Sequence, residues 1–473
     1  MLRALSSCLA ASLLAACSDP ASNTPARRVI LITCDTLRAD RLGFMGHPRP
    51  VSPNLDRLAA ESTVFDNAWS AAPLTGPALS ALLCGRFPDE IGAGPSNRDV
   101  ISEEVLSIAE VVQQAGIATA AFVSNGVLRR PPVSEGNVGV QQGFDHYDDD
   151  MNSKEKNRNL LERTADVCTD AVLNWLGQRT EDEPFFLWVH YQDPHGPYTP
   201  PAETLRSFER PAVAQNPLPF GTSNSGHYQI PKYQVLEGLA TPRPYEDRYD
   251  AEIHFFDEHV GRLLDGLRQR AMLDDALLVF TADHGESLGE HEYWFCHGET
   301  VQRELVQVPL VVRYPKALRD SSNPPQKGAK RVAGLVGHVD FWPTVVEALG
   351  LEAPTNRGHS WLGASVPEER VMPQFLGSIQ HPDRSLAVTD GRWRVVLFKA
   401  HPPQLYDLAS DPGERHDLAA KHPDVLADLH ARYTRFMEAD PRPHSKSVRP
   451  DLDPATKRGL NDLGYTDGDG DGH

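Results

Sequence analysis

Cysteine, long apolar runs and basic side chains are all scarce in this sequence. Four of its six cysteines lie beyond residue 17, and they form no CxxC pair and show no regular spacing. This spacing speaks against a disulfide framework or a zinc knuckle and predicts single buried thiols. Beyond the N-terminus, no apolar run approaches the roughly 20 residues that span a bilayer. The four cysteines are Cys34, Cys84, Cys168 and Cys296.

The charge balance is strongly acidic. Lys and Arg number 46 against 65 Asp and Glu, which gives a net charge of −19. Such a protein repels polyanions at long range, so we expect no nucleic-acid partner, and a densely sulfated polymer is disfavoured as a substrate. A small anionic ester held in a locally positive pocket is compatible with this charge.

The N-terminal residues carry targeting information. Arg3 precedes an apolar segment that ends in Leu14-Ala15-Ala16, directly before Cys17. This pattern is typical of a secretory signal, and its end resembles a bacterial lipobox, in which the cysteine is acylated. We expect a signal peptide over 1–16, lipidation at Cys17 and a tether over 17–27. The protein would then be exported and held at a membrane of the cell envelope, in the periplasm or at the surface. The alternative is a plain signal peptide with a chance cysteine.

Five continuous apolar, β-branched runs are typical of strands buried on both faces of a parallel sheet. They cover 28–33, 117–123, 185–191, 276–281 and 308–314. Helical patterns lie between them, one with its apolar face from Tyr249 to Leu267 and another over 102–114. The alternation predicts an α/β catalytic domain over 28–365, with a large doubly wound, mostly parallel sheet flanked by helices.

The pattern changes after about residue 365. Residues 386–388 and 393–398 flank an Asp-Gly turn, as in an antiparallel hairpin, and a helix is expected over 423–437. We therefore expect a small C-terminal antiparallel α+β subdomain over 366–440. The polar, Pro-rich residues 441–473 are expected to form a disordered tail.

Two acidic segments follow expected strands. Asp35 comes directly after the first strand, and Asp283-His284 ends the fourth. Ligands bind at the carboxyl ends of such strands, and an Asp beside a His can reach one cation with oxygen and nitrogen donors. Taken singly, Asp35 also suits a turn cap, and Asp283-His284 a solvated loop.

Thr75 and two histidine segments complete the candidate site. Thr75 precedes Gly-Pro and an apolar helix, so we expect it at the N-cap, where orphan N–H groups suit an anionic ester and help ionise a hydroxyl. An ordinary capping threonine is the alternative. His190 and His195 end a buried strand, and His297 precedes a glycine, which places them for a pocket.

Together these segments resemble the sulfatase family of the alkaline phosphatase superfamily over nearly the whole chain after the N-terminus. Further similar segments are 53–59, 338–344, 405–408 and 411–414. The resemblance implies an alkaline-phosphatase-like fold and a metal-dependent hydrolase of sulfate or phosphate esters.

Several residues depart from the family pattern. Counting back from residues 85–88, Thr75 stands where sulfatases carry the residue oxidised to formylglycine, and threonine is no substrate for that oxidation, so no formylglycine is expected. The other departures are Thr36 for a second Asp, Leu79 for Arg, Ser124-Asn125 for a Lys and His pair, and His284 for Asn.

These departures resemble the Thr-nucleophile branch of the superfamily, which includes bacterial phosphoethanolamine transferases. The resemblance implies one divalent metal ion (Zn, Mn, Ca or Mg) bound by four side chains. A histidine ligand favours Zn or Mn. His195 and His297 would bind substrate and stabilise or protonate the leaving oxygen. Those transferases carry membrane helices, which are not found here, so a hydrolase is expected. The metal set is Asp35, Thr75, Asp283 and His284.

Phosphate or phosphonate (di)esters are favoured as substrates. A simple Thr–O–sulfate lacks the geminal hydroxyl whose deprotonation expels sulfate from formylglycine, whereas a phosphothreonine can be hydrolysed by water. Three alternatives stay open: an arylsulfatase-like sulfuric ester hydrolase that works without formylglycine, a phosphoethanolamine-type transferase, and a non-catalytic surface lipoprotein that binds anions. The sequence indicates neither the natural substrate nor the oligomeric state.

Overall fold

The computed structural model describes residues 26–93, 97, 100–130, 139–157, 160–317, 330–362, 366–367, 369–376, 385–398, 401–439 and 445. The predicted signal peptide, Cys17 and most of the tether therefore lie outside the described residues, as does the predicted tail except for Ser445. The domain boundaries proposed from the sequence stay predictions. No helix within the described ranges is long and apolar enough to cross a membrane.

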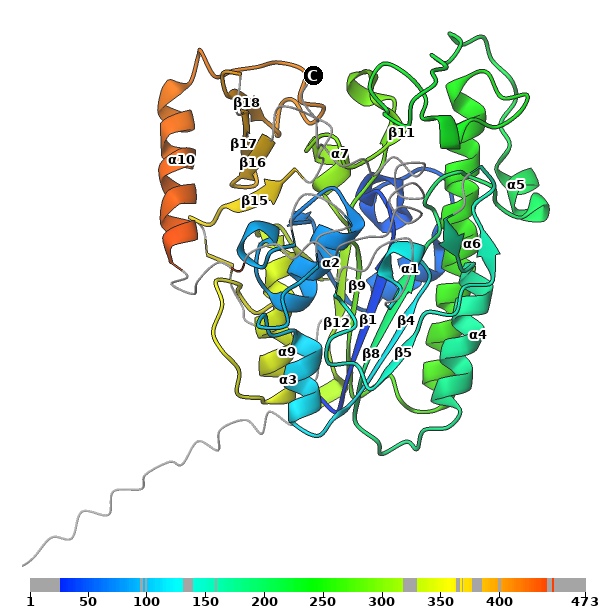
Figure 1. Cartoon of the computed structure of the whole chain (residues 1–473), viewed down its shortest axis with the longest axis vertical. Coiled ribbons are helices and arrows are strands. Elements are labelled where there is room, and N and C mark those ends of the chain that lie inside the picture. Colours follow the sequence, from blue (N-terminus) through cyan, green and yellow to red (C-terminus); the bar gives the residue numbers. More distant parts are fainter. Residues whose placement is uncertain are drawn as a thin grey trace, which may run out of the picture.

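An eight-stranded sheet forms the centre of the molecule, in the order β13-β2-β12-β9-β1-β8-β4-β5 (Figure 1). Only β12 runs against its neighbours β9 and β2, and every other neighbouring pair is parallel. This confirms the predicted large, mostly parallel sheet. The strand bounds are β1 Arg28–Cys34, β2 Thr63–Phe65, β4 Ala118–Val123, β5 His146–Asp148, β8 Phe185–Tyr191, β9 Ala276–Ala282, β12 Leu310–Arg313 and β13 Lys330–Val332.

The central strands are covered on both faces, as their unbroken apolar sequences predict. Every residue of β1, β8 and β9 is buried. Helices α4 and α6 lie on one side of the sheet, and α2, α3 and α9 lie on the other (Figure 1). Two covering layers explain why these strands lack apolar–polar alternation. The helix bounds are α2 Thr75–Cys84, α3 Ile108–Gln114, α4 Ala165–Leu176, α6 Pro242–Gln269 and α9 Phe341–Leu349.

Helix α3 begins six residues later than the sequence predicted, at Ile108 instead of Ser102. The reason is a capping box: Ser107 Oγ accepts the N–H of Glu110 at 3.1 Å, and the Glu110 carboxylate accepts the N–H of Ser107 at 2.8 Å. Ser102 Oγ instead accepts the N–H of Glu104 at 3.3 Å, and the residue three positions on, Val105, has no side-chain acceptor to return the bond.

A second, antiparallel sheet of β15-β16-β17-β18 follows, with α10 packed against it. The predicted hairpin is confirmed: β16 and β17 are joined at Asp390-Gly391, where Gly391 has φ +97°. Asp390 Oδ1 accepts the N–H of Trp393 at 2.7 Å and closes the turn. The bounds are β15 Met372–Phe375, β16 Ser385–Thr389, β17 Trp393–Phe398, β18 Gln404–Asp407 and α10 Pro423–Glu438.

The carboxyl ends of β1, β8 and β9 meet at one edge of the large sheet. Asp35 follows β1, and its N–H donates to Tyr191 O of β8 at 2.9 Å. Asp283 follows β9, and its N–H donates to Cys34 O of β1 at 3.2 Å. The strand pairing therefore continues into the residues that carry the chemistry and fixes their backbones beside one another.

Candidate active site

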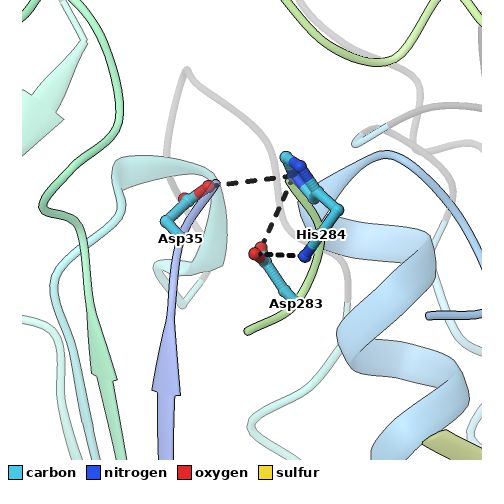
Figure 2. Close-up of side chains that lie close together, drawn as sticks. All are labelled: Asp35, Asp283 and His284. Atoms are coloured by element: carbon cyan, nitrogen blue, oxygen red, sulfur yellow. Dashed lines mark hydrogen bonds and ion pairs between the residues drawn. The ribbon is translucent and has the colours of Figure 1, made fainter. Parts of the chain in front are cut away.

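Asp35, Asp283 and His284 converge at this edge of the sheet (Figure 2). His284 Nε2 lies 3.7 Å from Asp35 Oδ1 and 3.6 Å from Asp283 Oδ2. One ligating atom from each residue lies within 4.8 Å of the others, and all three side chains are fully buried. The sequence-based expectation that two distant strand ends supply one cluster matches this arrangement.

The atoms that face one another in this cluster suit a divalent cation. Asp35 Oδ1 and Asp283 Oδ2 are buried and accept no hydrogen bond from the part of the chain that the structure describes. Such orphaned oxygens are costly unless a positive group compensates them. His284 Nδ1 lies 2.9 Å from Gly285 O, and because a carbonyl only accepts, Nδ1 carries the proton and Nε2 offers a lone pair.

The second oxygen of each carboxylate is held by the protein. Asp283 Oδ1 accepts the N–H groups of His284 at 2.7 Å and Thr36 at 3.2 Å. Asp35 Oδ2 accepts Nδ2 of Asn125 at 2.5 Å. Each carboxylate is thus oriented through one oxygen, which leaves the other for a ligand, as outer partners of metal sites commonly do.

The electrostatics of the cluster favour the protonation state that a metal ligand needs at Asp35 and His284, and oppose it at Asp283. Burial opposes ionisation of Asp35, but His195, His190 and His284 outweigh it and hold the pKa of Asp35 below its ordinary value. Burial, and then His297, lower the pKa of His284 to about 3, so this ligand is neutral at pH 7. Burial and the charge of Asp35 raise the pKa of Asp283 well above its ordinary value. A bound cation relieves the same repulsion between the two carboxylates.

Thr36 has an unusual backbone in this cluster. Its φ is +55°, in the left-handed region that β-branched residues rarely adopt, which costs on the order of 1–3 kcal/mol. This conformation directs its N–H to Asp283, while its carbonyl accepts the hydroxyl of Tyr249 at 2.6 Å. The residue that replaces the family's second aspartate therefore serves the site through its backbone.

Thr75 lies beside the cluster, although not at the N-cap that the sequence predicted. Helix α2 starts at Thr75 itself, Leu74 is the N-cap, and Leu74 O accepts the N–H of Ala78 at 3.0 Å. The Thr75 side chain is thereby freed from capping, and its Oγ1 lies 3.4 Å from His284 Nε2.

The N-terminus of α2 offers a bound anion fewer free backbone N–H groups than the sequence predicted. Gly76 N–H already donates to Asn97 Oδ1 at 2.7 Å, and Pro77 has no N–H. Of the four orphan amides at a helix start, these two are therefore not available to a ligand. The start of α2 therefore offers a bound anion less than the sequence predicted.

The two predicted pocket histidines lie next to the cluster. The ring of His297 is 4.6 Å from that of His284 and 5.1 Å from that of His195. His297 Nδ1 lies 3.1 Å from Glu286 Oε1, whose other oxygen accepts the hydroxyl of Tyr198 at 3.1 Å. His195 Nδ1 donates to Gly196 O at 2.7 Å. In both rings Nδ1 is engaged by an acceptor, so Nε2 is the atom suited to exchange a proton with a substrate.

The structure brings all six predicted residues of the body together. Sequence reasoning did not assign Asn125 and Glu286, and it placed His190 at the pocket without a role; these three residues support Asp35 and His297. Glu286 follows the Asp-His-Gly motif, and His190 belongs to the strand-end pair of histidines, so both had a signal. Asn125 had no such signal, because the sequence marks it only as a position where the family carries a Lys or His.

Comparisons with known proteins agree with this geometry. A sequence model of the sulfatase family matches residues 27–351. An N-acetylglucosamine-6-O-sulfatase of Bacteroides thetaiotaomicron is 23% identical over 530 residues, covering 92% of this chain and 91% of that protein. A choline-sulfatase of Rhizobium meliloti is 25% identical over 409 residues, covering 78% and 77%. The solved phosphonate monoester hydrolase of Agrobacterium radiobacter has a TM-score of 0.70 at 20% identity, covering 88% and 96%. The chain belongs to the sulfatase family, with an alkaline-phosphatase-like fold, and is a hydrolase acting on ester bonds.

Proposed function

We propose that the chain hydrolyses a monoanionic phosphorus ester, a phosphate diester or a phosphonate monoester, with Thr75 as nucleophile. One observation carries this proposal: Thr75 Oγ1 lies 3.4 Å from His284 Nε2, the nitrogen that faces the orphaned oxygens of Asp35 and Asp283. A hydroxyl in this place shares the site of the candidate cation, where an alkoxide is most stabilised.

Asp35, Asp283 and His284 would hold one divalent cation, with the Thr75 hydroxyl beside them. When bound, the cation would lower the pKa of that hydroxyl and neutralise an ester oxygen. The mixed oxygen and nitrogen donors favour Zn²⁺ or Mn²⁺ over Ca²⁺ or Mg²⁺.

The charge of the site suits a monoanion. The charges of Asp35 and Asp283 balance a divalent cation. The buried guanidinium of Arg38, which reaches Glu286 O, is already paired with Asp40 at 2.7 Å and Glu290 at 2.8 Å. Leu79 stands where the family carries an arginine. With this little excess positive charge, a dianionic monoester would be stabilised less than a diester or a phosphonate monoester.

The choice of phosphorus over sulfur follows from the nucleophile. Thr75 would lose its hydroxyl proton to solvent, and its Oγ1 would form a bond to phosphorus as the ester P–O bond breaks. Water would then bond to phosphorus as the P–O bond to Thr75 breaks, and a proton of that water would restore the Thr75 hydroxyl. A threonine sulfate lacks the neighbouring hydroxyl that expels sulfate from formylglycine. The phosphonate monoester hydrolase of Agrobacterium radiobacter supports the choice, because its fold accommodates such an ester.

The leaving oxygen needs a proton, and we assign its donation to His297. Glu286 accepts from Nδ1 of His297 and so orients the ring, which leaves Nε2 to donate to the leaving group. His195, whose ring lies 5.1 Å from that of His297, would stabilise charge on the transferring group.

Parallel assays test this proposal. We expect purified protein loaded with Zn²⁺ or Mn²⁺ to hydrolyse bis(4-nitrophenyl) phosphate and 4-nitrophenyl phenylphosphonate faster than 4-nitrophenyl sulfate. Release of both products to water, unaffected by added alcohols or sugars, separates a hydrolase from a transferase. Sulfate turnover above phosphorus turnover would support the arylsulfatase-like alternative and contradict our proposal.

We also propose that the protein is exported and anchored through acylated Cys17. The apolar segment after Arg3 and the Leu-Ala-Ala-Cys sequence support this. Metabolic labelling with palmitate tests it: we expect Cys17→Ser to lose the label and leave the membrane fraction. Cys8→Ser is the matched control, because it removes a cysteine from the same signal and should keep both properties. Labelled Cys17→Ser protein would contradict the anchor.

A further inference from the structure

A chain of buried polar side chains crosses from β8 to β1 and ends at Asp35. Trp188 Nε1 donates to Thr33 Oγ1 at 2.9 Å, and Thr33 Oγ1 lies 2.9 Å from His190 Nδ1. His190 Nε2 then lies 3.6 Å from Asp35 Oδ2. All four side chains are fully buried, and the parallel register pairs Thr33 directly with His190.

Trp188 sets which atoms donate and which accept in this series of hydrogen bonds. An indole nitrogen can only donate, so Thr33 Oγ1 must accept from Trp188, and its own proton is available to another acceptor. Two acceptors are near: His190 Nδ1 at 2.9 Å and Val189 O at 3.5 Å. Donation to Val189 O would let Thr33 Oγ1 accept from an Nδ1–H of His190, and would then turn the Nε2 lone pair of His190 towards the Asp35 carboxylate, 3.6 Å away. His190 Nδ1 therefore accepts, and the neutral imidazole carries its proton on Nε2.

Asp35 is thus flanked by two histidines of opposite tautomer. His284 carries its proton on Nδ1, through Gly285 O, and turns a lone pair towards Asp35 Oδ1. His190 carries its proton on Nε2 and turns it towards Asp35 Oδ2. The two rings distinguish the oxygens: Oδ2 faces N–H donors, and Oδ1 is left for the cation.

We propose that His190 is a positioning residue of the cation site, and that the Trp188–Thr33–His190 chain acts by fixing its Nε2–H tautomer. This role rests on the proposed cation site. With the other tautomer, His190 would turn a lone pair towards the carboxylate, and only Asn125 would support Asp35 Oδ2. An ordinary core histidine would not explain why Nε2 has no hydrogen-bond partner among the described residues yet lies beside this carboxylate.

Thr33→Val tests the chain, because it removes the hydroxyl and keeps the side chain's shape. Thr281→Val is the matched control: Thr281 pairs with Thr33 across β9 and β1, is also buried, and its hydroxyl donates to Pro309 O at 2.8 Å, away from His190. Thr33→Ser restores the hydroxyl. Affinity for Zn²⁺ and Mn²⁺ is measured by competition with a chelator, and the His190 tautomer by ¹⁵N NMR of histidine-labelled protein.

We expect Thr33→Val to lose the Nε2–H signature of His190. Asp35 then loses His190 as an outer partner, and cation binding should weaken by roughly 10–100-fold. Thr33→Ser and Thr281→Val should bind as wild type does. Equal binding by Thr33→Val and Thr281→Val, or an Nδ1–H tautomer in wild type, would overturn this role and leave the cation site standing. Wild-type protein that binds neither ion would overturn the cation site and this role with it.

Discussion

Nδ1 of His297 lies 3.1 Å from Oε1 of Glu286, and both side chains belong to the loop that follows the Asp283-His284 pair. Glu286 is fully buried and also accepts the hydroxyl of Tyr198. A carboxylate fixed from two sides holds the imidazole in one orientation and one tautomer. The segment that carries two of the proposed cation ligands, Asp283 and His284, therefore also carries His297, the proposed proton donor.

The proposed acid role of His297 predicts a dependence on the leaving group. His297→Asn should slow esters of poor leaving groups, such as alkyl alcohols, by about 10²–10⁴-fold, because their oxygen needs a proton as the bond breaks. Esters of 4-nitrophenol should slow little. The measurement is kcat/KM over a series of leaving groups. His291→Asn, an exposed histidine of the same loop, is the control. An equal loss for every leaving group would contradict the role.

Removing one carboxylate should change stability in opposite directions with and without metal. Burial and Asp35 raise the pKa of Asp283, which reports repulsion within the cluster. Asp283→Asn keeps Oδ1 for the N–H groups of His284 and Thr36. In chelator-treated protein we expect the variant to unfold at a higher temperature than wild type. At 100 times Kd, Zn²⁺ or Mn²⁺ should add about 2.7 kcal/mol to wild type and much less to the variant.

Thermal unfolding with and without the cation is the readout for this pair of proteins. An equal gain in stability from the cation for Asp283→Asn and wild type would show that Asp283 is not a ligand.

His338 should make stability depend on pH. Its Nε2 donates to Ala282 O at 3.0 Å, and burial lowers its pKa to about 4, against about 6.5 in the unfolded chain. Below about pH 6.5 the unfolded chain therefore binds a proton that the folded protein does not, and stability falls as the pH drops towards 4. Between about pH 7.5 and 5, this group alone costs about 2 kcal/mol.

His338→Gln isolates that contribution, because glutamine keeps a donor for Ala282 O and does not titrate. Urea unfolding of both chelator-treated proteins should show wild type losing about 2 kcal/mol more than the variant between about pH 7.5 and 5. Parallel curves for the two proteins would show that His338 does not titrate on unfolding.

The sequence predicted those parts of the site that local pattern determines. Asp35 and Asp283 each follow an apolar run, so their convergence could be inferred from the rule that parallel strands end at one edge. The role of Asn125 could not, since its bond to Asp35 joins residues 90 positions apart and depends on packing between loops. The predicted start of α3 was wrong because Ser102 and Ser107 are both possible N-caps. Only Ser107 has a glutamate three residues later that completes a capping box.

Two substitutions of Thr75 separate the effect of its hydroxyl from the effect of its side-chain shape. Thr75→Val should lower kcat/KM towards phosphorus esters by at least about a thousandfold, because valine keeps the shape of the side chain and removes the hydroxyl that lies 3.4 Å from His284 Nε2. Thr75→Ser keeps a hydroxyl and should retain measurable turnover. Cation affinity should fall far less than activity, since Asp35, Asp283 and His284 remain. Turnover by Thr75→Val at the wild-type rate is the contrary outcome.

Mass spectrometry of the Thr75 peptide, after acid quench during turnover of a saturating phosphorus ester, shows whether Thr75 is the nucleophile. We expect a phosphoryl or phosphonyl group on Thr75 in metal-loaded wild-type protein, and none in Thr75→Val. A Thr75 peptide that stays unmodified through many turnovers, or a group attached to another residue, would contradict this role.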